Sequence, residues 1–81
     1  HSLASVTVID DNAARADALA TGLLVLGPQA GYRIAETEGL AVLFIRRDGN
    51  KLTPRWSPAF VYAINSAKGL QQQATETDHN E

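Results

Sequence analysis

Asp17 and Thr21 are the residues of this chain whose types and spacing could do chemistry. They lie four positions apart in the segment ADALATGL, so that on a helix both side-chain oxygens share one face. The neighbouring residues are Ala and Gly, which leave room beside the backbone for a metal ion or a phosphate group. Because a carboxylate and a hydroxyl are hard oxygen donors, the pattern predicts a site for a hard cation. The alternative is a polar pair on an ordinary amphipathic helix.

A second pair of carboxylates, Asp10 and Asp11, directly precedes the segment that contains these residues. We interpret this pair, together with Asn12, as residues that cap a helix and complement the positive end of its dipole. The alternative is a ligand role, because strand ends in layered folds are frequent ligand positions. His1 and His79 lie near the two ends of the chain, where we do not expect ligands.

The first half of the chain predicts one strand followed by two helices. Ala4 to Ile9 alternates small or polar residues with β-branched ones, which is typical of a strand with one buried face. The helix that carries Asp17 is expected from about Ala13 to Leu26, and Gly27 and Pro28 end it. Pro28 suits the first turn of a second helix that reaches about Glu36. The apolar residues of the first helix recur with a 3.6-residue period; they are Ala14, Ala18, Leu19, Leu23 and Leu26.

The second half predicts a pair of strands and a tail. Leu40–Ile45 is a nearly unbroken apolar run of strand length, which predicts burial on both faces. A turn at Asp48–Asn50 should lead to a return strand over Lys51–Trp56, with Pro54 favouring an edge position. The order strand, helix, helix, strand, strand indicates an α+β fold. Residues 66–81 have almost nothing to bury, so we expect a disordered tail there.

The composition excludes several classes of function. The formal net charge is −2 and the basic residues are scattered, which argues against a nucleic-acid surface. The chain has no Cys, so disulfide scaffolds, thiolate metal sites and cysteine nucleophiles are excluded. The longest apolar run, Leu23 to Leu26, is far too short to cross a bilayer.

Five short motifs follow one another along the chain: S-V-T-V-I, A-D-A-L-x-T, G-L-x-V-L-G-P, G-L-A-V and W-S-P-x-F. In these motifs and their order the chain resembles the C-terminal part of the ApbE family, the FAD:protein FMN transferases once described as thiamine-biosynthesis lipoproteins. The resemblance runs from about Leu3 to Ile64, but it covers only the last part of the family's length. It implies that residues 1–65 are the C-terminal part of a longer α+β domain of the T-fold-like type.

The resemblance also implies a magnesium site. Asp17 matches the Asp that ligates the magnesium bridging the FAD pyrophosphate, and Thr21 matches the Thr of the same motif. The family uses a main-chain carbonyl near this turn, which implies Ala20 as a third ligand. The flavin-binding residues and the H-x-x-D-P-x-T-G element of the family lie upstream, so we expect the flavin contacts outside this chain. No catalytic residue is implied here, because the nucleophile belongs to the acceptor protein.

The implied activity is magnesium-dependent cleavage of FAD, with release of AMP and attachment of FMN through a phosphoester to a Thr or Ser of an acceptor flavoprotein. The implied partners are FAD, this acceptor and the N-terminal portion of the same enzyme, without which we expect the chain to be inactive. Relatives in Gram-negative bacteria are typically periplasmic lipoproteins anchored to the inner membrane, and we expect the same of the full-length parent.

A second interpretation belongs to a different functional class. In a non-catalytic α+β interaction or regulatory module, Asp17 and Thr21 would be polar helix residues, and the small side chains would permit close helix packing. Trp56 and Phe60 are expected to cover the sheet rather than to stack on a flavin. The order of the motifs along most of the chain favours the transferase.

Overall fold

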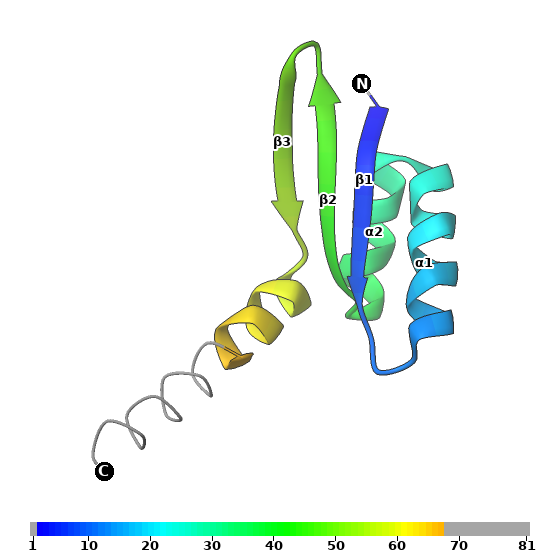
Figure 1. Cartoon of the computed structure of the whole chain (residues 1–81), viewed down its shortest axis with the longest axis vertical. Coiled ribbons are helices and arrows are strands. Elements are labelled where there is room, and N and C mark those ends of the chain that lie inside the picture. The colour runs from blue at the N-terminus through cyan, green and yellow to red at the C-terminus, as the bar shows by residue number, and fades with distance from the viewer. Residues whose placement is uncertain (1, 68–81) are drawn as a thin grey trace, which may run out of the picture.

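The computed structural model describes residues 2–67, in which the elements follow the predicted order. Strand β1 (Ser2–Ile9) leads into two helices, α1 (Ala13–Leu26) and α2 (Pro28–Glu38). The chain then forms a hairpin of β2 (Ala41–Asp48) and β3 (Lys51–Trp56). The three strands make one antiparallel sheet in the order β1, β2, β3 (Figure 1). The structure therefore confirms the predicted α+β fold and places β3 at an edge, as predicted.

A helix over residues 58–67 follows β3, and the predicted order does not contain it. It points away from the sheet in Figure 1. Residues 66 and 67, where the predicted tail begins, belong to this helix. The rest of the predicted tail, residues 68–81, lies outside the described residues.

Ser57 starts this helix and joins it to the sheet. Its hydroxyl oxygen accepts the N–H of Phe60 at 3.3 Å, as an N-cap does, and Pro58 occupies the first helical position. The same oxygen accepts the N–H of Val42 at 2.9 Å, and the hydroxyl donates to the carbonyl of Leu40 at 2.6 Å. Ser57 is fully buried, and its hydroxyl uses its one donor and both acceptor positions.

Gly27 separates the two longer helices. Its N–H donates to the carbonyl of Leu23 at 3.2 Å, and Pro28 stands in the first turn of α2, as predicted. The second helix continues to Glu38, slightly beyond the predicted end. Gly39 ends it with a φ of 68°, the left-handed conformation that favours glycine after a helix.

The core lies between the helix pair and one face of the sheet. It consists of Leu23 from α1, Ala35 from α2, and Val42 and Phe44 from β2. Gly31 lets α2 approach closely, because a Cβ at this position would lie 3.2 Å from both the carbonyl oxygen of Leu23 and the ring of Phe44. The two helices and the central strand therefore meet at a glycine.

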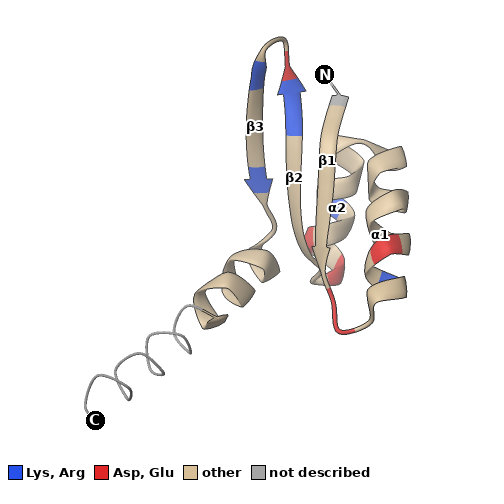
Figure 2. Cartoon of the chain, in the orientation of Figure 1, with Lys and Arg blue, Asp and Glu red and all other residues tan. Residues whose placement is uncertain are grey.

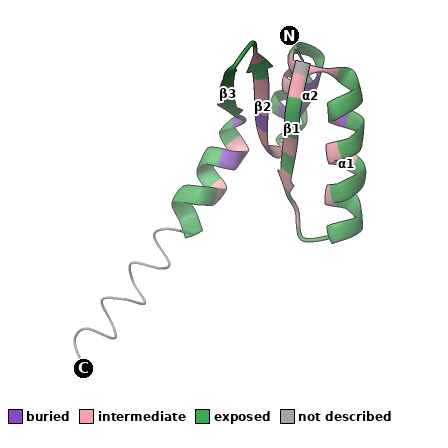
Figure 3. Cartoon of the chain, turned by 45° about the horizontal axis from the view of Figure 1, so that its top comes forward, coloured by how far each residue is buried: buried purple, intermediate pink, exposed green. Residues whose placement is uncertain are grey.

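β2 is buried on one face, not on both as its apolar run predicts. Val42 and Phe44 pack against the helices and are buried, whereas Leu43 and Ile45 on the other face are only half-buried. Figure 3 shows both buried and half-buried stretches along β2. Trp56, which pairs with Leu43 across the hairpin, is 48% exposed. Both α1 and α2 pack on the same side of the sheet, so the described residues supply no second layer.

α1 buries a narrower face than its apolar pattern predicts. Among the five residues of that pattern, Leu23 is buried and Leu19 is half-buried, whereas Ala14, Ala18 and Leu26 are exposed. The physical reason is the same as for β2, since α1 meets the sheet and α2 on one side only.

Candidate functional site

Asp17 and Thr21 are both exposed on α1, whose buried contact with the core is made by Leu23. The hydroxyl of Thr21 donates a hydrogen bond to the main-chain carbonyl of Asp17 at 3.0 Å. Because this bond uses the only hydroxyl hydrogen, the lone pairs of Oγ1 stay available to a cation. The helix therefore presents a carboxylate and an oriented hydroxyl oxygen together, as the four-residue spacing predicts.

The surface around this pair is made of small side chains. Ala18 and Gly22 are exposed neighbours on α1, and a Cβ at Gly22 would meet nothing within 4 Å. Among residues 2–67, no hydrogen bond or ion pair engages the carboxylate of Asp17. The carboxylate is therefore open to a ligand that approaches α1 from outside.

Ala20 suits a third ligand position less well. It is half-buried and lies inside the continuous helix Ala13–Leu26. A carbonyl at such a position points along the helix axis and accepts the N–H four residues further on. The ligand role of Ala20 rests on the resemblance alone and stays a prediction.

A complete metal site is not formed by the described residues, since no group of three or more His, Cys, Asp or Glu side chains there could hold an ion. Asp17 and Thr21 would bind a metal only with oxygens from water, a phosphate or another segment. This donor set fits Mg²⁺, which usually keeps several waters and takes one or two carboxylates plus substrate phosphates. It lacks the sulfur and imidazole ligands that are typical of zinc sites.

The charges are distributed unevenly over the molecule (Figure 2). Acidic residues gather where α1 begins and α2 ends, and basic residues gather on the β2–β3 hairpin. Arg15, the basic residue closest to Asp17 in the sequence, already pairs with Asp10, with 3.1 Å between Nε and Oδ2. A cation that binds at Asp17 would therefore enter a region of negative charge.

Asp10 supports the beginning of α1, which confirms the interpretation of this residue as part of the helix cap. Its Oδ1 accepts the N–H of Asn12 at 2.9 Å, beside the ion pair with Arg15. Asn12 is the N-cap, and its side chain accepts the N–H of Arg15 at 2.9 Å. Asp11 is exposed in the same turn, and both histidines lie outside the described residues.

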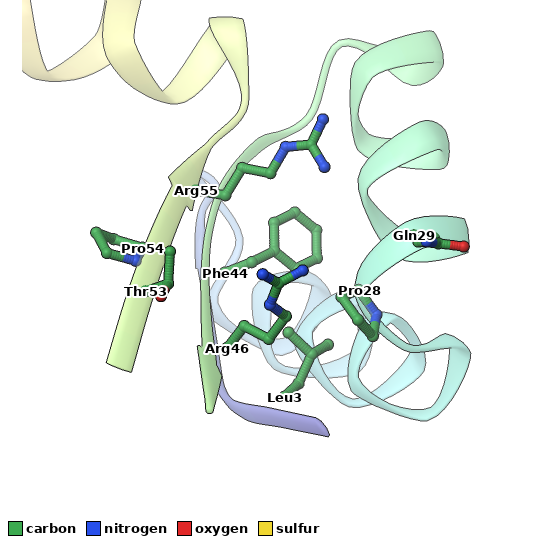
Figure 4. Close-up of a pocket in the computed structure, with 8 residues that line it drawn as sticks. All are labelled: Leu3, Pro28, Gln29, Phe44, Arg46, Thr53, Pro54 and Arg55. Carbon is green, nitrogen blue, oxygen red and sulfur yellow. The ribbon is translucent and has the colours of Figure 1, made fainter. Parts of the chain in front are cut away.

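A cavity of about 260 Å³ lies between the start of α2 and the hairpin (Figure 4). Two guanidinium groups line it. Arg46 donates to Oδ2 of Asp48 from Nε at 3.2 Å and from Nη2 at 3.1 Å, and the guanidinium of Arg55 lies 3.6 Å from the ring centre of Tyr32. Both groups are already engaged within the chain, and none of the predicted site residues lines this cavity.

Tyr32 links α2 to the hairpin, a role that the sequence does not signal. Its ring packs against Phe44 with 6.0 Å between centroids, and its hydroxyl donates to the carbonyl of Trp56 at 3.4 Å. Trp56 is 24 residues away along the chain, so no local pattern could have revealed this contact. Phe60 is buried, in agreement with the covering role expected of it, whereas Trp56 stays half-exposed.

The model of the ApbE family matches residues 1–44, which is more than half of the chain. This chain belongs to the ApbE family. Proteins similar to this ApbE chain include the FAD:protein FMN transferases of Escherichia coli, 44% identical over 68 residues, and of Salmonella typhimurium, 45% identical over 68 residues. Each match covers 84% of this chain and 19% of the relative. The ApbE chain thus spans about a fifth of the length of these relatives.

A solved structure shows the same fold as this ApbE chain. The crystal structure of Pseudomonas stutzeri flavinyl transferase ApbE, apo form, matches with a TM-score of 0.71 and 47% sequence identity. The match covers 74% of this chain and 19% of the solved one. It confirms the α+β arrangement and the family that the five motifs predict.

Proposed function

We propose that this chain is the metal-binding part of an FAD:protein FMN transferase. In this reaction the hydroxyl oxygen of a Thr or Ser in an acceptor flavoprotein bonds to the phosphorus of the FMN half of FAD. The P–O bond that joins this phosphorus to the AMP half breaks, AMP leaves, and the hydroxyl proton is released. The names of the relatives support the activity. The two exposed oxygen donors on α1 are the observation that supports a metal-binding role for this chain.

Asp17 and Thr21 would bind Mg²⁺ through the carboxylate and the hydroxyl oxygen. A bound Mg²⁺ would neutralise charge on the diphosphate of FAD. Asp17 contributes the negative charge that retains the cation. Thr21 contributes a neutral oxygen whose orientation is set by its bond to the main chain, which limits the positions that the cation can take.

The composition of α1 indicates that another part of the longer protein covers the candidate site. From Ala18 to Leu26 the helix has no charged residue, and Val25 is 82% exposed. A helix that is apolar on all sides is typically buried, so we expect another part of the polypeptide to cover this side. A carboxylate beneath such a cover requires a cation, because an unpaired buried charge is strongly destabilising. Asp17 has no cationic partner among the described residues, which favours a bound metal.

A non-catalytic interaction or regulatory module is the alternative. The exposed apolar side of α1 favours it, since such a surface also suits packing against a partner protein. In that case the negative charge of Asp17 would have no part in any reaction of the protein.

A chimera separates the two functions. In it, this chain replaces the matching residues of the Escherichia coli FAD:protein FMN transferase. Asp17→Ala should lower the rate of FMN transfer to a purified acceptor by at least about 100-fold, because charge stabilisation worth several kcal/mol is lost. The thermal unfolding of the chimera should stay unchanged, since Ala is well tolerated in a helix.

Asp11→Ala is the matched control, because it removes an exposed carboxylate just before the same helix. It should leave both the transfer rate and the magnesium response unchanged. An Asp17→Ala chimera that transfers FMN at the original rate, with the original magnesium response, would contradict the metal role and favour the interaction module.

We also propose that the full-length protein is a periplasmic lipoprotein anchored to the inner membrane, a location supported by the resemblance alone. No helix within residues 2–67 is long and apolar enough to cross a membrane. Fractionation of cells that express the full-length protein tests the location. Recovery with the inner membrane supports it, and recovery in the cytoplasm contradicts it.

A further inference from the structure

The cavity between α2 and the hairpin continues along α2 in both directions. Towards the end of α2, a hollow of about 480 Å³ shares Gln29 and Arg55 with the cavity. Towards the start of α2, another hollow of about 480 Å³ shares Pro28, Gln29 and Arg46 with it. We call these three spaces together the α2 groove. From Pro28 to Glu36 the groove follows α2 for about 12 Å, the length of roughly four residues of extended polypeptide.

The α2 groove is lined mainly by basic charge. Arg33 from α2, Arg46 from β2 and Arg55 from β3 line it. Glu36 is the one acidic residue among the described residues that line it, and it stands at the end of the groove away from Arg46. Figure 2 shows basic residues on both strands of the hairpin. A surface with this excess of positive charge attracts an acidic ligand.

Two of these arginines are held in place and still have hydrogen-bond donors to offer. A guanidinium has five N–H groups. Arg46 uses Nε and Nη2 for Asp48, so the hydrogens on Nη1 remain. Arg55 lies over the ring of Tyr32, and within residues 2–67 no hydrogen bond or ion pair engages its N–H groups. Because both guanidinium groups are already ordered, binding a carboxylate costs them little side-chain entropy.

The floor of the central cavity is apolar. Phe44 lies between the two guanidinium groups in Figure 4 and is only 2% exposed. Leu3, Pro28 and Pro54 complete the apolar lining. The cavity of about 260 Å³ is smaller than most pockets for small molecules, so its size suits one or two side chains of a protein.

We propose that the α2 groove binds an acidic segment of the acceptor flavoprotein. Carboxylates of this segment pair with Arg46 and Arg55, and an apolar side chain enters the cavity over Phe44. A guanidinium matches the two oxygens of a carboxylate, and the length of the groove suits an extended segment. The inference rests on the proposed function, because that reaction requires a protein acceptor. The groove includes neither Asp17 nor Thr21, so the groove and the metal site can be tested separately.

The kinetics of FMN transfer by the full-length protein test the groove. The acceptor is the flavoprotein from the same cells that gains the mass of FMN in the presence of the enzyme. Arg46→Gln combined with Arg55→Gln should raise the KM for this acceptor at least about fivefold, because partly exposed charge pairs contribute to encounter and binding. The kcat should stay close to its original value. Added salt should raise the KM of the original protein, and it should raise that of the double variant less.

Gln29→Glu is a second variant that tests the groove without removing an arginine contact. Gln29 is exposed in the first turn of α2, where a negative charge stabilises the helix. The new carboxylate would line all three parts of the groove and should raise the KM by repulsion. Arg47→Gln is the matched control, because it removes an exposed arginine of β2 that does not line the groove. This control should leave the KM and its salt dependence unchanged.

An unchanged KM in the groove variants overturns the proposal, and Gln29→Glu alone decides if the double variant does not fold. If the KM is unchanged while calorimetry shows that the variants lose binding of inorganic phosphate, the groove holds a small anion instead. If the KM is unchanged and the variants unfold at a lower temperature without acceptor, a segment of the same polypeptide fills the groove. Failure of the unaltered protein to transfer FMN to any protein would overturn the proposed function itself, whereas transfer with an unchanged KM overturns the groove alone.

Discussion

Thr21 shows how a bond inside a helix determines what a side chain offers to its surroundings. A hydroxyl that donates to a carbonyl one turn earlier is held in one orientation, so it loses little freedom when it binds a cation. The same residue without this bond would first have to be ordered, at a cost in side-chain entropy. As a metal ligand, Thr21 would therefore lose less side-chain entropy than an unconstrained surface hydroxyl.

Removal of this hydroxyl should weaken the binding of magnesium more than it slows the reaction. In the chimera, Thr21→Val preserves the volume of the side chain and should raise the magnesium concentration for half-maximal FMN transfer by about tenfold. Thr21→Ser keeps the hydroxyl and should shift it less. Magnesium titrations of the two variants provide the measurement, and an unchanged midpoint for Thr21→Val would exclude Thr21 as a ligand.

Ser57 should prove important for stability although it stands outside the candidate site. Ser57→Ala leaves the buried N–H of Val42 without its partner and removes the cap of the following helix. The expected loss is about 2–3 kcal/mol in the free energy of unfolding. Denaturant unfolding of the chimera measures it, with the exposed Ser66→Ala as the control. Equal stability of the two variants would show that another group replaces the Ser57 hydroxyl.

The same-face placement of Asp17 and Thr21 was predictable because it depends only on helical periodicity, which acts over one turn. The hydrogen bonds of Ser57 to Leu40 and Val42 were not, since they join positions 15 or more residues apart. The metal role itself stays a prediction, because the described residues do not form a complete set of metal ligands.

At the scale of elements, boundaries were predictable and burial was not. Gly27 with Pro28 separates two helices through local backbone preferences that need no partner. Burial depends on what lies opposite, and the apolar run of β2 carries no information on whether a second layer is present. The helix over residues 58–67 was missed although Ser57 and Pro58 signal its start, because its apolar side chains do not repeat with a clear amphipathic period.

Gly31→Ala tests the close contact between α2 and the core. The new methyl group would lie 3.2 Å from the carbonyl oxygen of Leu23, a backbone atom that cannot turn away. Overpacking of this kind should lower the free energy of unfolding of the chimera by about 1–3 kcal/mol, against the usual gain when Ala replaces Gly in a helix. Ala30→Ser at the exposed position before it should change stability little. A stabilised Gly31→Ala variant would mean that the two helices separate easily.

At the scale of the whole molecule, the described residues leave large apolar side chains exposed on both the sheet and the helices. One face of the sheet carries half-buried Leu43 and Ile45 beside exposed Trp56, and α1 leaves Val25 exposed. A chain of this length buries only a modest fraction of its surface even when its core is complete. The motifs identify the family, whereas the structure shows which apolar faces the described residues leave exposed.

The chain expressed alone should therefore lack a cooperative unfolding transition. Circular dichroism during heating should show a gradual loss of signal, and amide protection should be low throughout the sheet. The chimera should unfold in a sharp transition under the same conditions, because we expect the remainder of the enzyme to cover these faces. A sharp transition of the chain alone, with high protection in all three strands, would contradict this expectation.

The asymmetry between the two sheet edges also limits how copies of the chain can assemble. A sheet with two open edges adds further copies without end, which is the geometry of a fibre. Here Pro54 interrupts the edge of β3, whereas β1 has no Pro, Gly or charged residue, so the chain by itself has a single open edge. Two copies that join through β1 occupy both open edges, and growth by strand pairing stops at the dimer.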